Sequence, residues 1–502
     1  MPTFTEGNDI YLVHTAGTFD LDMLGGDDTL TVQGGTSTTA HMGTGNDIAQ
    51  LKSGLATVFG DAGTDRFEIY AANATVDGGD DNDLVNIRGG SGITASGGLG
   101  DDRFNIYAGS TNLSLDGGDG NDDFFGYFHA VTGSIHGGIG SDYFVQFVSG
   151  VSIYGGAGND IYRADATSPA TFVELTGEGT DAVQVARGAS YTLPDNIENI
   201  SVQGFHGSVL TAAALTGNAL NNTINGHANI ETIFGLGGDD RLFAKGGDDT
   251  VWGGEGNDYL DGGPGNDTLN GEAGNDTING RTGNDTMAGG TGDDTYYIDS
   301  LSDVVTENAS EGADLVRVSV TGYTLAANVE NGIVSSGVGG LQLTGNLLDN
   351  QLTGSTGADT LRGGDGDDTL RGGAGNDTLS GDASIDSLFG GGGADDLHGG
   401  GGHDLFVYTS ISDSPLGGSD TIYDQDNILN GTAADTVDVS AIDADTGIAG
   451  DQAFVLVTSP TGAAGEIWVD LDGTNEIFAD VDGGGADFTI VLAFASKIDL
   501  IL

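Results

Sequence analysis

Aspartate recurs at intervals of nine residues through two segments of this 502-residue chain, each time at the end of a glycine-rich run. An apolar residue stands two positions after every one of these aspartates, thirteen times out of thirteen. A nine-residue unit can bury almost nothing alone, so the period predicts a stack of short strands and turns. The aspartates are Asp240, Asp249, Asp258, Asp267, Asp276, Asp285 and Asp294, then Asp359, Asp368, Asp377, Asp386, Asp395 and Asp404.

The first 165 residues carry a related pattern with twice the spacing. Their loop aspartates are 18 to 20 residues apart, and pairs of short strand-like segments lie between them. We interpret one coil as two strands and two turns, with the glycine–aspartate loop on one side only; the later segments carry it on both sides. The aspartates of this region are Asp9, Asp28, Asp47, Asp65, Asp83, Asp102, Asp122, Asp142 and Asp160.

The loops have the composition of a calcium site. Glycine allows positive φ and close approach of successive backbones, so that carbonyl groups turn inward beside the aspartate. Ca²⁺ takes six to eight oxygen ligands of this hard type. The best matches begin at Gly253, Gly262 and Gly372, whereas the loop 42–47 lacks the first glycine and the loop 381–386 lacks the fourth.

The charge balance points the same way. The chain has 76 acidic and 13 basic residues, a formal charge of −63, which opposes compaction unless cations neutralise it. The same sign argues against a nucleic-acid partner. With no cysteine, disulfides and thiolate chemistry are excluded, and six scattered prolines among 92 glycines do not fit collagen.

These repeats resemble the RTX (repeat-in-toxin) nonapeptide G-G-x-G-x-D-x-U-x, a calcium-binding parallel β-helix pattern. The resemblance implies an all-β fold, a right-handed parallel β-roll or β-helix solenoid, with Ca²⁺ held between same-side loops one coil apart. Loop carbonyls and the sixth-position aspartate would be the ligands, which carries over to the 22 aspartates above. On this basis the chain would bind roughly 17 calcium ions.

Two connectors between the repeats match each other, so that connector and block form a duplicated cassette. The text from Glu178 to Asn199 parallels that from Glu311 to Asn331. The expected organisation is 1–165 (one-sided coils, an assembly module), 166–232 (connector), 233–298 (nonapeptide block), 299–352 (connector), 353–405 (nonapeptide block) and 406–502 (β-rich export domain).

The last segment, 406–502, looks like the C-terminal domain of serralysin-type metalloproteases, through Asp404–Tyr408, Ser419–Asp424, Val437–Asp443 and Ala486–Ile490. That likeness implies export by a type I secretion apparatus that reads an uncleaved C-terminal signal. No N-terminal signal peptide and no membrane span are expected. Gln425 departs from the aromatic usual there, and the acid-poor loop 480–485 is disfavoured as a calcium site.

No catalytic constellation is found. H-E-x-x-H and G-x-S-x-G are both missing, and His398 and His403 fit loop positions better than a metal pair. Polysaccharide-acting β-helix enzymes remain an alternative. Five aromatic residues occupy the position that is apolar in the nonapeptide and are expected in the interior of the coils: Phe67, Phe104, Phe124, Phe144 and Tyr162. Tyr70, Tyr107 and Phe147 would be either interior as well or part of an exposed row of rings that contacts a glycan or a partner.

We therefore expect a non-enzymatic, extracellular, calcium-binding RTX protein that self-assembles into a surface layer or matrix. Its partners would be calcium, other copies of itself and the type I secretion apparatus. The alternative is a calcium-dependent adhesin that binds cell-surface polysaccharide. An uncapped first coil would offer unpaired strand edges to another copy, which makes residues 1–165 the expected assembly module. The alternative for this region is a passive stalk.

Overall fold

A computed structural model describes residues 4–107, 109–127, 131–147, 150–164, 170–186, 188–203, 213–335, 340–423, 435–442, 455–456, 460–461, 463–470, 476–483, 485–493 and 499–501. The chain divides into two compact units, residues 1–245 and 246–502. Strands, turns and bends make up both, and none of the described residues is helical. Of the residues named near the C-terminus, Asp424, Gln425 and Asp443 lie outside the described ranges.

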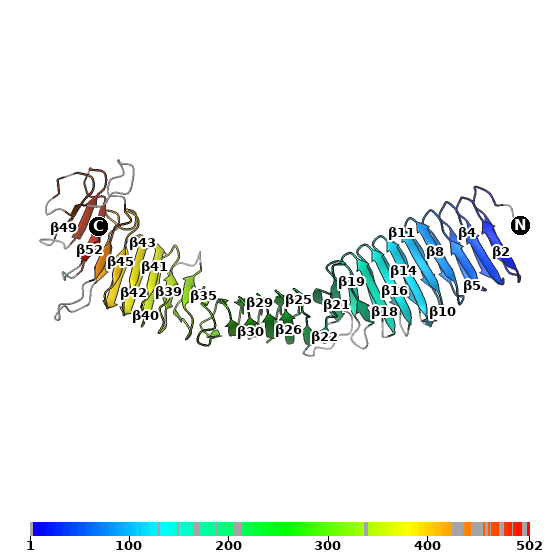
Figure 1. Cartoon of the computed structure of the whole chain (residues 1–502), viewed down its shortest axis with the longest axis horizontal. Coiled ribbons are helices and arrows are strands. Elements are labelled where there is room, and N and C mark those ends of the chain that lie inside the picture. The colour runs from blue at the N-terminus through cyan, green and yellow to red at the C-terminus, as the bar shows by residue number, and fades with distance from the viewer. Residues whose placement is uncertain are drawn as a thin grey trace. The chain divides into compact units, whose positions relative to one another are not determined.

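Unit 1 is a stack of parallel strands in long sheets (Figure 1). Each strand pairs with its equivalent one coil along, for example Ile10 with Thr29 and Thr94 with Ser114. One sheet contains β1 (Ile10–Val13), β3 (Thr29–Gln33), β5 (Ile48–Ser53), β7 (Arg66–Ile69), β9 (Leu84–Ile87), β12 (Arg103–Tyr107), β15 (Asp123–Tyr127), β17 (Tyr143–Phe147), β19 (Ile161–Ala164), β21 (Ala182–Ala186), β23 (Asn199–Gln203), β25 (Thr223–Asn225) and β27 (Arg241–Phe243), most of which directly follow a loop aspartate.

The return strands of unit 1 form their own sheets. One contains β2 (Thr18–Asp22), β4 (Ser37–His41), β6 (Ala56–Phe59), β8 (Thr75–Asp80), β11 (Thr94–Leu99), β14 (Leu113–Asp119), β16 (Gly133–Ile139), β18 (Val151–Ala157) and β20 (Thr171–Val173). Another contains β22 (Tyr191–Thr192), β24 (Ala213–Thr216) and β26 (Glu231–Gly237), and β10 (Gly90–Ser91) pairs with β13 (Ser110–Thr111). The prediction of two strands per coil is confirmed.

Unit 2 repeats this plan with nine-residue half-coils. Thr250 pairs with Thr268 and Tyr259 with Thr277, so repeats alternate between two faces and each coil contains two of them. One face has β29 (Tyr259–Asp261), β31 (Thr277–Asn279), β33 (Thr295–Ile298), β35 (Leu315–Val318), β37 (Asn331–Val334), β39 (Gln351–Thr353), β41 (Thr369–Ala374), β43 (Ser387–Gly392), β45 (Leu405–Val407), β47 (Thr436–Asp438) and β52 (Asp499–Ile501).

The opposite face of unit 2 ends in antiparallel strands, where β49 pairs with β50 and β50 with β51. Its strands are β28 (Thr250–Glu255), β30 (Thr268–Ala273), β32 (Thr286–Thr291) and β34 (Val304–Thr306), then β36 (Tyr323–Thr324), β38 (Gln342–Thr344), β40 (Thr360–Gly364), β42 (Thr378–Ala383), β44 (Asp396–Gly401), β46 (Asp420–Tyr423), β51 (Phe488–Leu492), β50 (Glu476–Asp480), β49 (Glu466–Asp470) and β48 (Val455–Leu456). Both connectors contribute strands, as expected.

The core is a set of single-residue stacks inside each coil. All thirteen apolar residues of the nonapeptides are at most 1% exposed. In unit 1 the rings of Phe104, Phe124, Phe144 and Tyr162 stack in sequence with centroids 4.7, 5.1 and 5.2 Å apart. The interior prediction for these four aromatics, and for Phe67, is confirmed.

The three remaining aromatics divide between the inside and the outside. Phe147 is buried, Tyr70 is 50% exposed, and Tyr107 is partly exposed on the outer face of β12. No helix in the described part of the chain is long and apolar enough to cross a membrane.

Candidate calcium-binding loops

The glycines of each loop let two coils approach more closely than side chains would allow. In the loop 155–160, Gly156 and Gly158 have φ of +99° and +147°, a conformation that favours glycine. The first-position glycine is constrained in another way. A Cβ on Gly137 would lie within 3.0 Å of Asp142 Oδ2 and of the Gly155 carbonyl oxygen in the next coil. Two oxygens therefore converge on the small space that this glycine leaves open.

The best-matching loops leave the same cradle. A Cβ on Gly253, Gly262 or Gly372 would collide with the Oδ2 atom of the aspartate that ends its own loop. Gly253 and Gly372 also face the carbonyl oxygen of the equivalent glycine one coil later. A carboxylate oxygen and a carbonyl oxygen from adjacent coils are hard donors of the kind that Ca²⁺ prefers.

Most loop aspartates are tied to the preceding coil through one of their oxygens. The backbone N–H of Asp102 donates to Asp122 Oδ1 at 2.7 Å, and Asp122 donates to Asp142 Oδ1 at 2.7 Å. The same bond recurs in unit 2, where Asp267 donates to Asp285 Oδ1 at 2.8 Å. The result is a ladder of hydrogen bonds, charge-assisted when the aspartates are ionised, that fixes these carboxylates in one orientation.

The second oxygen of most loop aspartates has no hydrogen-bond partner. These side chains are at most 3% exposed, so no bulk water reaches the Oδ2 atom. A buried anionic oxygen without a donor is expensive, and a bound cation removes that cost. The aspartates concerned are Asp28, Asp47, Asp65, Asp83, Asp102, Asp122, Asp142, Asp160, Asp267, Asp276, Asp285, Asp294, Asp368, Asp377, Asp386 and Asp395.

Burial also shifts the acidity of these groups. It raises the pKa of Asp65 to about 8 and the pKa of Asp102 and Asp276 to about 7, and neighbouring loop carboxylates add to the rise. Without metal, the folded loops therefore favour the protonated, neutral acid. A divalent cation would compete with those protons for the same oxygens.

The remaining predicted ligands fall into two groups. Asp240, Asp249, Asp258 and Asp404 are buried in equivalent loops. Asp9 and Asp359 differ, because their Oδ2 atoms accept hydrogen bonds from the backbone N–H and the hydroxyl of Thr5 and Ser355, respectively. Neither carboxylate needs a cation to satisfy that oxygen.

The ladder runs into the connectors through residues that the nonapeptide pattern does not include. Asp160 donates its N–H to Asp181 Oδ1 at 2.8 Å, and Asp181 donates to Glu198 Oε2 at 2.7 Å. In the second connector Asp314 and Glu330 take these places. Their spacing is irregular, so only the match between the two connectors signalled them.

Amides replace carboxylates where each ladder restarts. Asn222 donates its N–H to Asp240 Oδ1, and Asn350 does the same to Asp368 Oδ1. The Oδ1 atoms of the two asparagines accept the backbone N–H of Asn218 and Asn346. A neutral amide keeps the backbone bond without adding a buried charge.

The disfavoured alternatives also have defined surroundings. In the loop 480–485, Asp480 accepts backbone N–H groups from Asp482, Gly483 and Gly485, and its side chain lies near those of Asp482 and Asp487. His398 stacks on Tyr423 with ring centroids 4.3 Å apart, and His403 is exposed. No cluster of metal-ligating side chains found among the described residues contains a histidine.

A parallel solenoid whose loops each present glycine carbonyls and one aspartate oxygen defines a calcium-binding β-roll. The family model of the RTX calcium-binding nonapeptide repeat (4 copies) matches residues 151–166, 216–244, 225–260, 234–269, 261–296, 344–379 and 371–406. The chain thus carries RTX calcium-binding repeats that are folded as a parallel β-roll. No match was found among curated proteins. The family match ends at residue 406, and the serralysin-type likeness of the C-terminal segment stays a prediction.

Proposed function

We propose that this chain is a secreted structural protein that folds on extracellular calcium and assembles with copies of itself into a surface layer or matrix. RTX repeats are typical of secreted proteins, and their β-roll is usually non-catalytic. The expected export route is a type I apparatus acting on an unfolded chain. The C-terminal segment would carry the signal.

One observation carries the proposal: nearly every coil buries a carboxylate oxygen that has no donor. At the low calcium concentration of a cytosol, ionised loops would hold the coils apart, and the chain with its charge of −63 would behave as an acidic disordered polymer. Calcium at millimolar concentration outside the cell would satisfy the loops and allow the coils to stack. Extracellular calcium modules bind at about 10⁻⁴ to 10⁻³ M.

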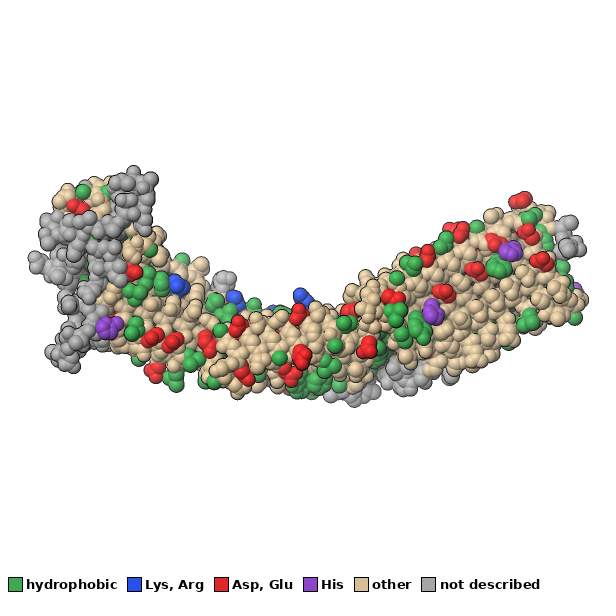
Figure 2. Space-filling model, in the orientation of Figure 1, with side chains coloured by type: hydrophobic (Ala, Val, Ile, Leu, Met, Phe, Trp, Pro, Cys, Tyr) green, Lys and Arg blue, Asp and Glu red, His purple; other side chains and the backbone are tan. Residues whose placement is uncertain are grey.

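The charge of the outer surface would make assembly depend on calcium. In the view of Figure 2, acidic side chains recur along the visible surface, with far fewer Lys and Arg side chains among them. Like charges of this density keep two copies apart at low ionic strength. The same divalent cation that folds the coils would also lower this repulsion between copies.

The test is imaging and spectroscopy of the full chain with and without calcium. Circular dichroism in chelator should show a disordered spectrum, and calcium addition should produce β structure. Electron microscopy at saturating calcium should then show sheets or filaments, while magnesium at the same ionic strength should give neither change. A native β spectrum at neutral pH in chelator would refute calcium-driven folding. A folded monomer in calcium would refute only the assembly part of the proposal.

A second candidate function is binding of an anionic polysaccharide, because unit 1 gathers cations and rings on one outer face. The guanidinium of Arg88 lies 4.1 Å from the ring centroid of Tyr107, and Arg103 lies 4.3 Å from that of Phe125. Tyr107 stacks on Tyr127 with centroids 5.0 Å apart. Stacked rings beside arginines suit sugar faces and carboxylates.

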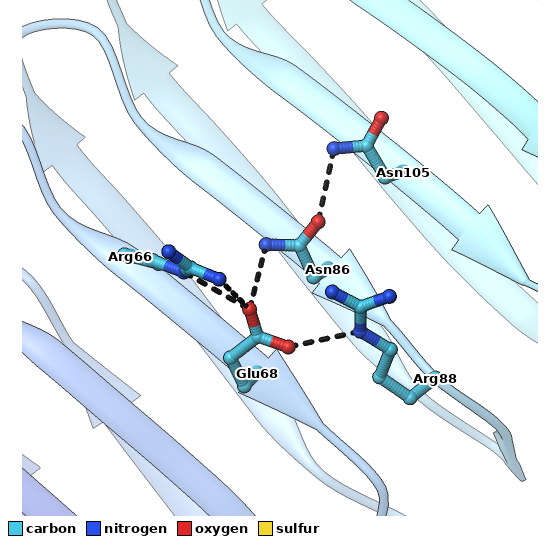
Figure 3. Close-up of polar contacts among 5 residues, drawn as sticks. All are labelled: Arg66, Glu68, Asn86, Arg88 and Asn105. Carbon is cyan, nitrogen blue, oxygen red and sulfur yellow. Dashed lines mark hydrogen bonds and ion pairs between the residues drawn. The ribbon is translucent and has the colours of Figure 1, made fainter.

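A buried polar network anchors this face (Figure 3). Glu68 accepts hydrogen bonds from Arg66, Arg88 and the Asn86 amide, and Asn105 donates to Asn86 at 2.9 Å. A polyuronate titrated into the calcium-loaded protein should bind, and a neutral glucan should not. Tyr107→Ala and Tyr127→Ala should weaken binding, whereas Tyr297→Ala in unit 2 is the matched control. Equal affinity in all three variants would rule this face out.

A further inference from the structure

Two clusters of three buried carboxylates occupy equivalent positions, each where a repeat segment meets the connector that follows it. One consists of Asp160, Glu174 and Asp181 in unit 1, and the other of Asp294, Glu307 and Asp314 in unit 2. Within each cluster, one carboxylate oxygen from every residue lies within 4.8 Å of the other two. In both, a nonapeptide-type aspartate meets two acids from the connector that follows it. We refer to them as the connector clusters.

The connector glutamate takes the place of a backbone carbonyl. In the coil before, the cradle at Gly137 is formed by Asp142 Oδ2 and the carbonyl oxygen of Gly155. At Gly155 itself, the groups within 3.0 Å of a Cβ are Asp160 Oδ2, the Tyr162 hydroxyl and Glu174 Oε1. A side-chain carboxylate thus lies where the next coil elsewhere provides an uncharged oxygen.

The second cluster repeats the substitution. A Cβ on Gly271 would meet Asp276 Oδ2 and the Gly289 carbonyl oxygen, whereas one on Gly289 would meet Asp294 Oδ2 and the Tyr296 hydroxyl. The Gly289 N–H donates to Glu307 Oε1 at 3.2 Å. In each cluster the tyrosine hydroxyl donates to Oε1 of the glutamate and holds it in position.

Unpartnered oxygens aimed into the clusters point to a ligand. Asp160 Oδ2 and Glu174 Oε2 have no hydrogen-bond partner, and these residues are 0% and 4% exposed. Asp294 Oδ2 and Glu307 Oε2 are in the same state, at 1% and 7% exposure. None of the ion pairs between described residues involves the six carboxylates. Up to three negative charges would share each buried space.

We propose that each connector cluster binds one calcium ion through three carboxylates, a donor set distinct from that of the nonapeptide loops. The inference rests on the proposed calcium dependence of the loops. Affinity for Ca²⁺ rises with the number of charged ligands, so these two sites should bind at least about tenfold more tightly than the loops. The two connector sites therefore fill first.

The position of the two sites gives them a role in folding order. Glu174 follows Asp160 by 14 residues and Glu307 follows Asp294 by 13, so ligation ties the end of each repeat segment to the connector after it. Closing a loop of this length before the coils stack lowers the entropy of the chain that has yet to order. The tight sites would act as starting points from which coils add on either side.

Calcium titration of the full chain tests the proposal, with Glu174→Gln, Glu307→Gln and the double variant, and exposed Asp20→Asn in β2, outside the loops, as control. Equilibrium dialysis should show one bound calcium fewer in each single variant and two fewer in the double variant, against no loss in the control. Calorimetry should lose the tightest phase, and the calcium midpoint of folding should rise. Circular dichroism at saturating calcium verifies that the variants fold.

A second readout uses terbium in place of calcium. Tyr162 and Tyr296 lie in the clusters, so tyrosine-sensitised luminescence should appear with the first two equivalents of Tb³⁺ and fall in Tyr162→Phe and Tyr296→Phe. Unchanged stoichiometry and an unchanged first phase in the double glutamine variant would overturn the proposal and assign the clusters to shared protons. If the unaltered chain bound no calcium, the proposed function would fail instead.

Discussion

Asp83 donates its backbone N–H to Oδ1 of Asp102 across a 2.7 Å hydrogen bond, although the two residues are 19 positions apart. Asp102 is held by its own N–H to the next coil in the same way. Each carboxylate therefore has two separate tasks: Oδ1 joins neighbouring coils, and Oδ2 faces the space between loops. Substitutions that keep one oxygen and change the other separate these tasks.

Asp102→Asn should have opposite effects with and without calcium. The amide oxygen can keep the bond from Asp83, while the NH₂ group replaces the ligand oxygen and removes a buried charge. In calcium, the variant should bind about one ion fewer and lose roughly 1–3 kcal/mol of stability. Without metal it should be the more stable protein. Denaturant unfolding with dialysis checks both signs, and exposed Asp119→Asn should change neither.

Gly381→Ala should weaken calcium binding by a purely steric effect. Its Cβ would collide with Asp386 Oδ2 and the Gly399 carbonyl oxygen, while a Cβ on Gly392 in the next nine-residue repeat would meet nothing within 4 Å. Neither glycine has a positive φ, so both alanines are free of backbone strain. The first substitution should raise the calcium midpoint of folding and the second should leave it unchanged. Equal midpoints would mean that the cradle binds no cation.

The metal-free chain should regain structure in acid. The folded pKa values of Asp65, at about 8, and Asp102, at about 7, lie above their ordinary value of 3.8 because of burial. The stability linked to these raised values is present in full below about pH 4 and disappears as the pH rises through 7 to 8. Circular dichroism of calcium-free protein should show most β structure at low pH. A signal that is constant across this range would contradict the assignment of buried, neutral acids.

Glu68 should respond to pH in the opposite direction. Although burial raises its pKa, the hydrogen bonds from Arg88 and Arg66 outweigh burial and leave the pKa below 4.5. The stability that Glu68 contributes is present above that value and is lost as the pH falls through the folded pKa. Glu68→Gln should thus destabilise unit 1 near neutral pH and have little effect in acid. A matched urea series at two pH values measures the difference.

Ser384→Gly should stabilise unit 2. Ser384 occupies the fourth position of the loop 381–386 with φ of +84°, a backbone conformation that is strained for any residue with a Cβ. Relief of that strain, less the added entropy of the unfolded chain, should yield about 0.5–1 kcal/mol. Ser387→Gly in β43, where the backbone is extended, should destabilise instead. Urea midpoints in saturating calcium distinguish the two.

The nonapeptide period predicted the strands, the coil and the buried apolar row, because each depends on a repeat that is local in sequence. The nonapeptide period could not predict the acidic residues of the connectors. Glu174 and Glu307 follow their partner aspartates by 14 and 13 residues, intervals that match neither nine nor 18. The repeat also could not predict that Asp9 and Asp359 differ from the other loop aspartates. Their Oδ2 atoms accept hydrogen bonds from Thr5 and Ser355. Such contacts follow from three-dimensional packing.

Within the nonapeptide blocks, equivalent strands pair at an offset of 18 residues, which makes one coil a unit of inheritance. Removing 18 residues between equivalent loop positions, for instance 268–285, would place Thr286 where Thr268 was. Because these two residues are equivalent partners in adjacent coils, the alternation of inward and outward side chains would continue across the junction. Removing 17 would reverse every side chain beyond the junction. Unequal recombination between near-identical repeats in the gene can therefore lengthen or shorten this protein by whole coils without an intermediate that fails to fold, and natural variation in length should come in multiples of one coil.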